Sequence, residues 1–182
     1  FDGVHPGHRA VINEAGLIAR NEGVPWAVLT FEPHPRQMFS PNQDPFRLTP
    51  LRAKAREIMA MGVDFLIVQR FDKAFSQIKA EDFVMNALVK NLGARHVVSG
   101  YDFVFGHNRG GHCDLLLAMG KKEGFGFTAV SAISDKTGEV YSSTRIREQL
   151  KNANPVGAAE VLGRNFELSG RVVHGNHLGR KL

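Results

Sequence analysis

Apolar residues along most of the chain follow a helical period in some stretches and form continuous runs in others. Residues 7–22 repeat apolar side chains at helical spacing, which places one set on a common face: Val11, Ile12, Ala15, Ile18 and Ala19. Gly23 follows at once, and glycine is a common residue at a helix end. Residues 25–31, PWAVLTF, are then almost continuously apolar, which is typical of a strand buried on both faces.

The same alternation continues further along the chain. Thr49 and Pro50 predict an N-cap and a first helical residue, for a helix that ends near Met61. Further strands are predicted at 64–69, 96–100 and 126–132, and further helices at 80–92 and 113–123. Apolar strands that alternate with helices predict an α/β protein with a parallel sheet covered by helices on both faces. Such sheets bind ligands beyond the carboxyl ends of their strands.

The two ends of the chain depart from this regular pattern. The first predicted helix should follow a strand, of which Phe1 would be the last residue, so we expect that first strand to be missing. After Leu150, Asn154 and Pro155 open a short helix that ends near Gly163. Short alternating segments without a helical period follow. We therefore expect a first module at 1–153, a linker helix at 154–165 and the truncated start of a β-rich domain at 166–182.

Composition and charge narrow the possible functions. The chain has 182 residues, a formal net charge of +5 and a single cysteine, Cys113, so it cannot form an intrachain disulfide. It shows no signal-peptide pattern and no apolar run near the roughly 20 residues of a membrane span. We expect a cytoplasmic protein that does not interact with membranes. The positive residues are spread along the chain, which favours a polyphosphate ligand over a nucleic-acid groove.

The first motif with chemical potential is His5-Pro6-Gly7-His8, at the start of the first predicted helix. Unpaired N–H groups and the helix dipole favour an anion there, and Gly7 lets a phosphate approach the backbone. The two imidazoles can donate hydrogen bonds to phosphate oxygens whose charge grows as a bond breaks. Two ordinary surface histidines in a turn are an alternative. A zinc pair is another, although no cysteine or carboxylate cluster completes four ligands.

The second motif is Ser142-Ser143-Thr144-Arg145-Ile146-Arg147. Hydroxyl groups before a helix, together with its first N–H groups, suit phosphate, and arginine can hold phosphate with two hydrogen bonds. Plain capping by Ser143, with the arginines in solvent, is the alternative. Two anion-binding helix starts can face one triphosphate from opposite sides, so the two motifs together predict a nucleoside triphosphate site.

Five segments carry a resemblance to a known family. They are FDGVHPGH at 1–8, TFEPHP at 30–35, RLTPLRAK at 47–54, GYDFVFGHNRGG at 100–111 and SSTRIREQL at 142–150. In this order and spacing they resemble the FAD synthetase module of bacterial bifunctional riboflavin kinase/FAD synthetases, within the nucleotidylyltransferase superfamily. Residues 163–182 resemble the start of the riboflavin kinase domain of that family. The implied fold is a Rossmann-like parallel sheet followed by the beginning of a β-barrel kinase domain.

The resemblance implies a reaction in which FMN and ATP give FAD and pyrophosphate with Mg²⁺. It also implies that the full-length protein phosphorylates riboflavin to FMN. In this reading His5, His8 and Arg147 are catalytic, and the ATP-binding residues are Gly3, Gly7, Asp102, Ser143 and Thr144. The flavin-binding residues are Pro33, His34, Phe103 and Arg109, and the metal ligands are unknown. The loop at 32–46 would close over the flavin.

Simpler roles exist for several of these residues, and rival functions exist for the chain. Asp102 suits a turn, His34 an incidental loop position, Phe103 core packing and Arg109 a solvated loop. One rival function is a nucleotidylyltransferase that acts on phosphopantetheine or nicotinamide mononucleotide. Others are a non-catalytic nucleotide- or RNA-binding module, favoured by the basic charge, and a structural fragment with an incomplete site. We expect small-molecule substrates and no nucleic acid.

Overall fold

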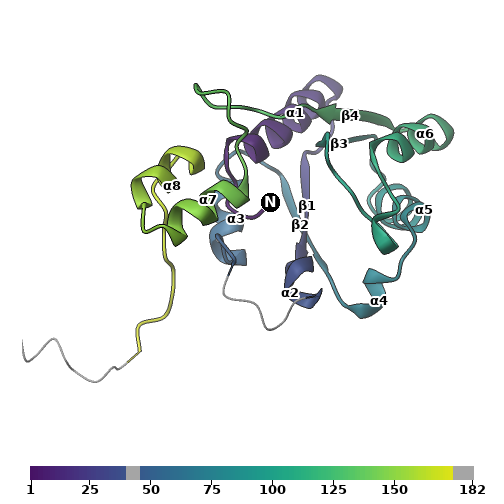
Figure 1. Ribbon diagram of the computed structural model, residues 1–182. Helices are drawn as coiled ribbons and strands as arrows, with labels where there is room; N and C mark the ends of the chain where they lie inside the picture. Colours follow the sequence, from purple (N-terminus) through teal and green to yellow (C-terminus); the bar gives the residue numbers. More distant parts are fainter. Residues whose placement is uncertain (40–45, 174–182) are drawn as a thin grey trace, which may run out of the picture.

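The computed structural model of this chain describes residues 1–39 and 46–173. Helices and strands alternate along the chain (Figure 1), as the apolar pattern predicts. The strands are β1 (Ala27–Glu32), β2 (Phe65–Arg70), β3 (His96–Gly100) and β4 (Gly126–Val130). The longer helices are α1 (Pro6–Glu22), α3 (Leu51–Met59), α6 (Cys113–Glu123), α7 (Ser143–Lys151) and α8 (Pro155–Leu162). Each lies within a few residues of its predicted position.

The strands form two parallel pairs rather than the single sheet that the pattern predicts. β1 pairs with β2 from Ala27 opposite Phe65, and β3 pairs with β4 from His96 opposite Gly126. Among the described residues no strand joins β1 to β3, so the two pairs share no ladder. The prediction was wrong on this point because apolar runs identify buried parallel strands without showing which strands are neighbours. Side-chain packing connects the pairs instead.

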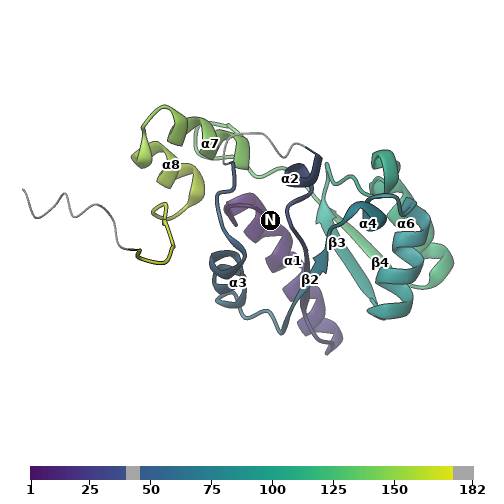
Figure 2. The ribbon, with the colours of Figure 1, turned by 90° about the horizontal axis from the view of Figure 1, so that it is seen from below.

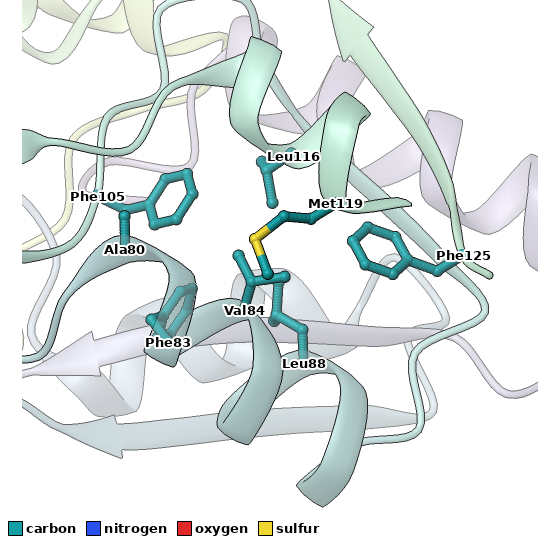
Figure 3. Close-up of a cluster of buried hydrophobic side chains, with 8 residues drawn as sticks. All are labelled: Ala80, Phe83, Val84, Leu88, Phe105, Leu116, Met119 and Phe125. Atoms are coloured by element: carbon teal, nitrogen blue, oxygen red, sulfur yellow. The ribbon is translucent and has the colours of Figure 1, made fainter. Parts of the chain in front are cut away.

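Alternate residues of β1 pack on opposite sides, and helices cover both. Val28 belongs to a buried cluster with Ile12 of α1 and Ile58 of α3. Leu29 and Phe31 face the other way and pack against a second cluster, drawn in Figure 3: Ala80, Phe83, Val84, Leu88, Phe105, Leu116, Met119 and Phe125. Val97 of β3 and Phe127 of β4 pack against that same cluster. Helices on both faces of the β1–β2 pair are thus confirmed, and the second cluster holds the two strand pairs together.

Several local features differ from the sequence prediction. The predicted loop at 32–46 contains a short helix, α2 (Pro35–Phe39), which starts at a proline whose fixed φ suits a first helical turn. Residues 40–45 of the predicted loop lie outside the described residues. A further short helix, α4 (Lys73–Ser76), was not predicted, and Asp72 caps it. The predicted helix at 80–92 is α5 (Ala80–Phe83) followed by a π-helix, η1 (Val84–Asn91). The predicted loop at 101–112 contains a short 3₁₀ turn, η2 (His107–Arg109).

The end of the described chain packs onto the first module. Figure 2 shows α7 and α8 side by side, and Ile146 of α7 shares a buried cluster with Leu48, Ala158, Val161 and Leu162. Gly163 ends α8 in the left-handed region, with φ of 76°, as its position in the sequence predicts. Residues 166–173 contain no strand, and 174–182 lie outside the described residues. The division into domains therefore stays a prediction.

The second cluster leads to a prediction about stability. Leu116 of α6 is fully buried there, whereas its neighbour Leu117 is 45% exposed. We expect Leu116→Ala to lower the free energy of unfolding by about 2–5 kcal/mol, because the deletion leaves a cavity in a packed core. The matched control Leu117→Ala should change it by less than about 0.5 kcal/mol. Urea unfolding of both variants measures the difference, and equal effects would show that Leu116 does not hold this core.

Candidate functional site

A buried carboxylate lies at the centre of the candidate site. Asp2 is 4% exposed and accepts hydrogen bonds from the backbone N–H groups of Leu48 and Thr49, at 3.1 and 2.9 Å. The Thr49 hydroxyl donates to Asp2 Oδ1 at 3.2 Å and accepts from the Gly3 N–H at 2.9 Å. The sequence predicts Thr49 as the N-cap of α3, and this prediction is wrong: the N-cap is Pro50. The Thr49 hydroxyl group instead binds the first residues of the chain.

Asp2 also connects the start of the chain to the first turn of α7. Arg147 Nη2 donates to Asp2 Oδ2 at 2.6 Å, and the Ser143 hydroxyl donates to the Asp2 carbonyl oxygen at 2.6 Å. Burial raises the pKa of Asp2, but the N–H groups of Thr49 and Leu48 and the Arg147 guanidinium outweigh it and hold that pKa below its ordinary value of 3.8. Figure 1 shows the N-terminus beside α7 and α3. The residues that lead into the first motif therefore contact the second motif at Asp2.

The start of α1 and the start of α7 leave several donors available to a ligand. Among the described residues, no hydrogen bond engages the backbone N–H groups of Gly7 and His8, or those of Ser143 and Thr144. A side chain at position 7 would meet the His5 ring at 3.2 Å and the Tyr141 carbonyl at 3.5 Å. Gly7 thus lies between the two helix starts. Ser142, rather than Ser143, caps α7 by accepting from the Arg145 N–H.

The two histidines of the first motif stack on each other. The His5 and His8 ring centroids are 3.7 Å apart with an interplanar angle of 25°. Within the described residues both Nδ1 atoms are buried and lack a hydrogen-bond partner. Burial lowers the pKa of His5 from 6.5 to about 4 and the pKa of His8 well below 6.5. Both rings are therefore neutral near pH 7.

Residues 30–34 and 46–54 form a neighbouring network that sequence reasoning did not predict. Lys54 is 2% exposed, and its ammonium donates to Thr30 at 3.3 Å and to Glu32 at 2.9 Å. Glu32 also pairs with Arg47. The centroids of the Phe46 and His34 rings are 5.2 Å apart. The Arg147 guanidinium lies over the Phe46 ring, 5.5 Å from its centroid.

These contacts place His34 beside the Arg147 end of the site, through Phe46. Burial lowers the pKa of His34 from 6.5 to about 4. Pro33 is exposed and directly follows β1, after a cis peptide bond. The predicted flavin-side segment and the second motif are thus joined by one aromatic ring.

The remaining predicted residues lie on the loop after β3, and no described contact joins them to the histidines. Asp102 and Arg109 are exposed, and Arg109 adopts a left-handed conformation with φ of 57°. Phe103 stacks on the buried Phe105 ring, with centroids 5.3 Å apart, and packs against the second cluster. Gly106 lies against Ala80, so this loop covers α5.

Sequence reasoning missed Lys54 and Asp2, and only Lys54 carries a recognisable signal. Lys54 stands three positions after Leu51 and four before Ile58, so helical spacing alone places it on the buried face of α3. Asp2 lies three positions before the first motif, and its partners come from distant segments. Only the fold shows that it is buried.

The site suits a ligand with several negative charges. It combines two helix N-termini, neutral histidines with unpartnered nitrogens and the Arg147 guanidinium. Within residues 1–39 and 46–173, no group of three or more histidine, cysteine or acidic side chains is placed to hold a metal ion. Nor does any helix in that part of the chain have the length and apolar character to cross a membrane.

Comparison with known proteins identifies the family. Residues 1–145 match the family model described as FAD synthetase. The chain belongs to the FAD synthetase family. Over all 182 residues, this family member is 40% identical to a bifunctional riboflavin kinase/FMN adenylyltransferase of Escherichia coli K12. It is 38% identical to a protein of the same name from Pseudomonas fluorescens.

In both cases the alignment covers the whole FAD synthetase-family chain, which spans 58% of the length of each relative. A solved structure described as a macrolide-efflux protein from Streptococcus pneumoniae is also similar, with a TM-score of 0.85 and 29% identity. The likeness covers all of this chain and 58% of that one. These matches extend the family likeness beyond residue 145, to the segments that carry Arg147 and α8.

Breaking the central pair in this FAD synthetase-family chain should weaken the fold. We expect Asp2→Asn to lower the free energy of unfolding at pH 7 by about 3 kcal/mol, because it leaves the Arg147 charge without its buried partner. Because the pKa of Asp2 is lowered on folding, its contribution is lost as the pH falls below 3.8 and through the folded-state pKa. The difference between the two proteins should therefore shrink in acid.

Urea unfolding at pH 7 and pH 3 measures both effects. The exposed Asp82→Asn is the control, and we expect no comparable loss from it. An Asp2→Asn variant as stable as the control at pH 7 would contradict a stabilising role for the pair.

A further prediction concerns how the free energy of unfolding depends on pH. The unfolded chain takes up a proton on His5 as the pH falls through 6.5, whereas the folded protein resists protonation down to about 4. The free energy of unfolding should therefore decrease as the pH falls between these values. We expect His5→Gln to have a flatter pH dependence in urea unfolding at pH 7, 6 and 5. His112→Gln, at an exposed position, should keep the parent slope, and an unchanged slope in His5→Gln would argue against a buried neutral His5.

Proposed function

We propose that this chain transfers AMP from ATP to FMN, giving FAD and pyrophosphate. The observation that carries the proposal is the junction at Asp2, which brings the starts of α1 and α7 together through Arg147 and Ser143. A triphosphate is the ligand that two adjacent anion-binding helix starts fit best. Family membership supports the choice of ATP and FMN as substrates.

The proposed chemistry needs no nucleophile from the protein. A phosphate oxygen of FMN attacks the α-phosphorus of ATP in line, and the bond to the bridging oxygen of pyrophosphate breaks. The chain then accelerates the reaction by holding the phosphates in place and by stabilising the charge that develops on the leaving group. Each of these tasks requires donors fixed before the substrate arrives.

We assign the triphosphate to the two helix starts. His5 and His8 approach the phosphates from α1, where Gly3 and Gly7 keep the backbone close to the ligand. Ser143 and Thr144 offer their backbone N–H groups from α7, and Thr144 adds an exposed hydroxyl group. Arg147 uses two nitrogens on Phe46 and Asp2, which fixes the plane of its guanidinium. We propose that its remaining nitrogen, Nη1, donates to the triphosphate.

We assign the flavin to the loops that follow β1 and β3. Pro33 and His34 come directly after β1, and Asp102 and Phe103 come after β3, so both pairs stand at carboxyl ends of parallel strands. We propose Pro33, His34, Phe103 and Arg109 for the flavin side and Asp102 for the nucleotide. Contact of His34 with Phe46, which also packs on Arg147, supports a position for the flavin next to the phosphates.

We further propose that Mg²⁺ enters as MgATP. Mg²⁺ commonly keeps several waters and binds through substrate phosphates. The described residues offer no cluster of three metal ligands, and Asp2 is already satisfied by protein donors. We include riboflavin phosphorylation by the whole protein in the proposal, because the longer relatives carry that activity in their names. The proposal places the protein in the cytoplasm, in a nucleotidylyltransferase fold, with small-molecule substrates and no nucleic acid.

The direct test is to supply MgATP and FMN and to measure FAD and pyrophosphate. We expect both products, formed in equal amounts. Nicotinamide mononucleotide and phosphopantetheine serve as parallel acceptors. Turnover of either one without formation of FAD would replace FMN as the substrate, and no turnover of any acceptor would refute the proposed function.

Two substitutions test the assignment of the helix starts. We expect His8→Ala and Arg147→Ala each to lower kcat by about 10²-fold or more, the scale for losing one donor to a transition state. His112→Ala, an exposed histidine at the start of α6, is the matched control and should retain activity. Steady-state formation of FAD measures the effect, with circular dichroism to verify folding. A folded His8→Ala protein with normal kcat would remove His8 from the site.

A further inference from the structure

Arg164, which follows the end of α8, binds the backbone that leads into the first motif. Its Nη2 donates to the Gly3 carbonyl oxygen at 2.8 Å, and its Nη1 donates to the Val4 carbonyl oxygen at 3.3 Å. Among the described residues, no other donor reaches either carbonyl group. One planar guanidinium thus holds two consecutive peptide groups directly before His5.

The conformation of these two residues explains why they need such a partner. Gly3 has φ of 96° and Val4 has φ of 48°, so both lie in the left-handed region. That region is unfavourable for a β-branched residue, and Val4 is also fully buried. Strained residues of this kind persist only where their surroundings hold them in place. Packing of the Val4 side chain in a buried cluster and the hydrogen bonds from Arg164 to both carbonyl groups supply that constraint.

A second path connects Arg164 to the first turn of α1. Its Nε pairs with Glu57 Oε2 at 3.1 Å, and Arg9 Nη2 binds that same oxygen at 2.9 Å. The forked geometry of arginine, with donors in one plane, suits simultaneous contact with a carboxylate and two carbonyls. Arg164 thus contacts both the loop before α1 and, through Glu57 of α3, the helix itself.

We propose that Arg164 is a positioning residue for nucleotidyl transfer, an inference that rests on the proposed function above. It does not touch the substrate; it holds Gly3 and Val4 so that His5, His8 and the first N–H groups of α1 face the phosphates. Arg164 lies beyond the 1–145 region that matches the FAD synthetase family model. The segment after α8 is therefore part of the machinery of the first module rather than a passive connection.

The experiment compares Arg164→Ala, Arg164→Lys and the control Arg56→Ala in the full protein. Arg56 binds Glu167 at 2.5 Å and pairs with Glu57 at 3.7 Å, so its removal perturbs the same segment and the same carboxylate while the hydrogen bonds from Arg164 to Gly3 and Val4 remain. We expect Arg164→Ala to lower kcat about tenfold or more, since misplaced donors lose transition-state stabilisation. Arg164→Lys should be intermediate, because an ammonium cannot reproduce the fork. Arg56→Ala should retain the parent kcat, and all three must be folded at the assay temperature.

Hydrogen exchange without substrate gives a readout that a general loss of stability would not reproduce. We expect faster exchange in Arg164→Ala confined to the hydrogen-bonded amides of Gly3 and Arg9, with 113–123 unchanged. Parent-like exchange at these two amides, faster exchange spread evenly over the chain, or a normal kcat in Arg164→Ala would each overturn the proposal. Because exchange is measured without substrate, it tests Arg164 even where the parent protein makes no FAD, an outcome that would refute the proposed function alone.

Discussion

The arrangement of the candidate site depends on the ion pair between Asp2 and Arg147. A carboxylate buried to this extent is costly unless donors surround it, and Asp2 meets Leu48, Thr49 and Arg147 at 2.6 to 3.2 Å. These partners come from the segment before α3 and from α7, while Asp2 itself leads into α1. A single side chain therefore fixes three otherwise separate parts of the chain relative to one another.

Much of the fold could be predicted from the sequence because it depends on local patterns. The α1 helix follows from its apolar face and from Gly23, and β1 follows from its continuous apolar run. The order of the strands could not be predicted, because apolar runs do not encode neighbours. Thr49 shows a related limit: its position suits an N-cap, but a distant backbone N–H at Gly3 engages its hydroxyl group instead. Long-range contacts decide such cases.

Some residues of the candidate site could likewise be predicted from the sequence, and others could not. The motifs at 5–8 and 142–147 were recognisable because helix starts with glycine, hydroxyl groups and arginine have a known affinity for phosphate. The structure brings these motifs together, while Asp102, Phe103 and Arg109 remain on a loop that packs elsewhere. Asp2 and Arg164 could not be found from spacing, because their partners are separated from them by more than 140 residues in several cases. The burial of Lys54 could have been predicted, since helical spacing in the sequence places it on an apolar helix face.

These long separations in sequence have a consequence for how the protein folds during translation. Asp2 meets Arg147 across 145 positions, and Arg164 reaches Gly3 across 161. The α1 helix and the β1–β2 pair can form while the ribosome is still at work, but the loop before α1 has no restraint from Arg164 until that residue has left the exit tunnel. The loop before α1 and the start of α7 would thus reach their final arrangement only late in synthesis, after the earlier helices and strands have left the ribosome.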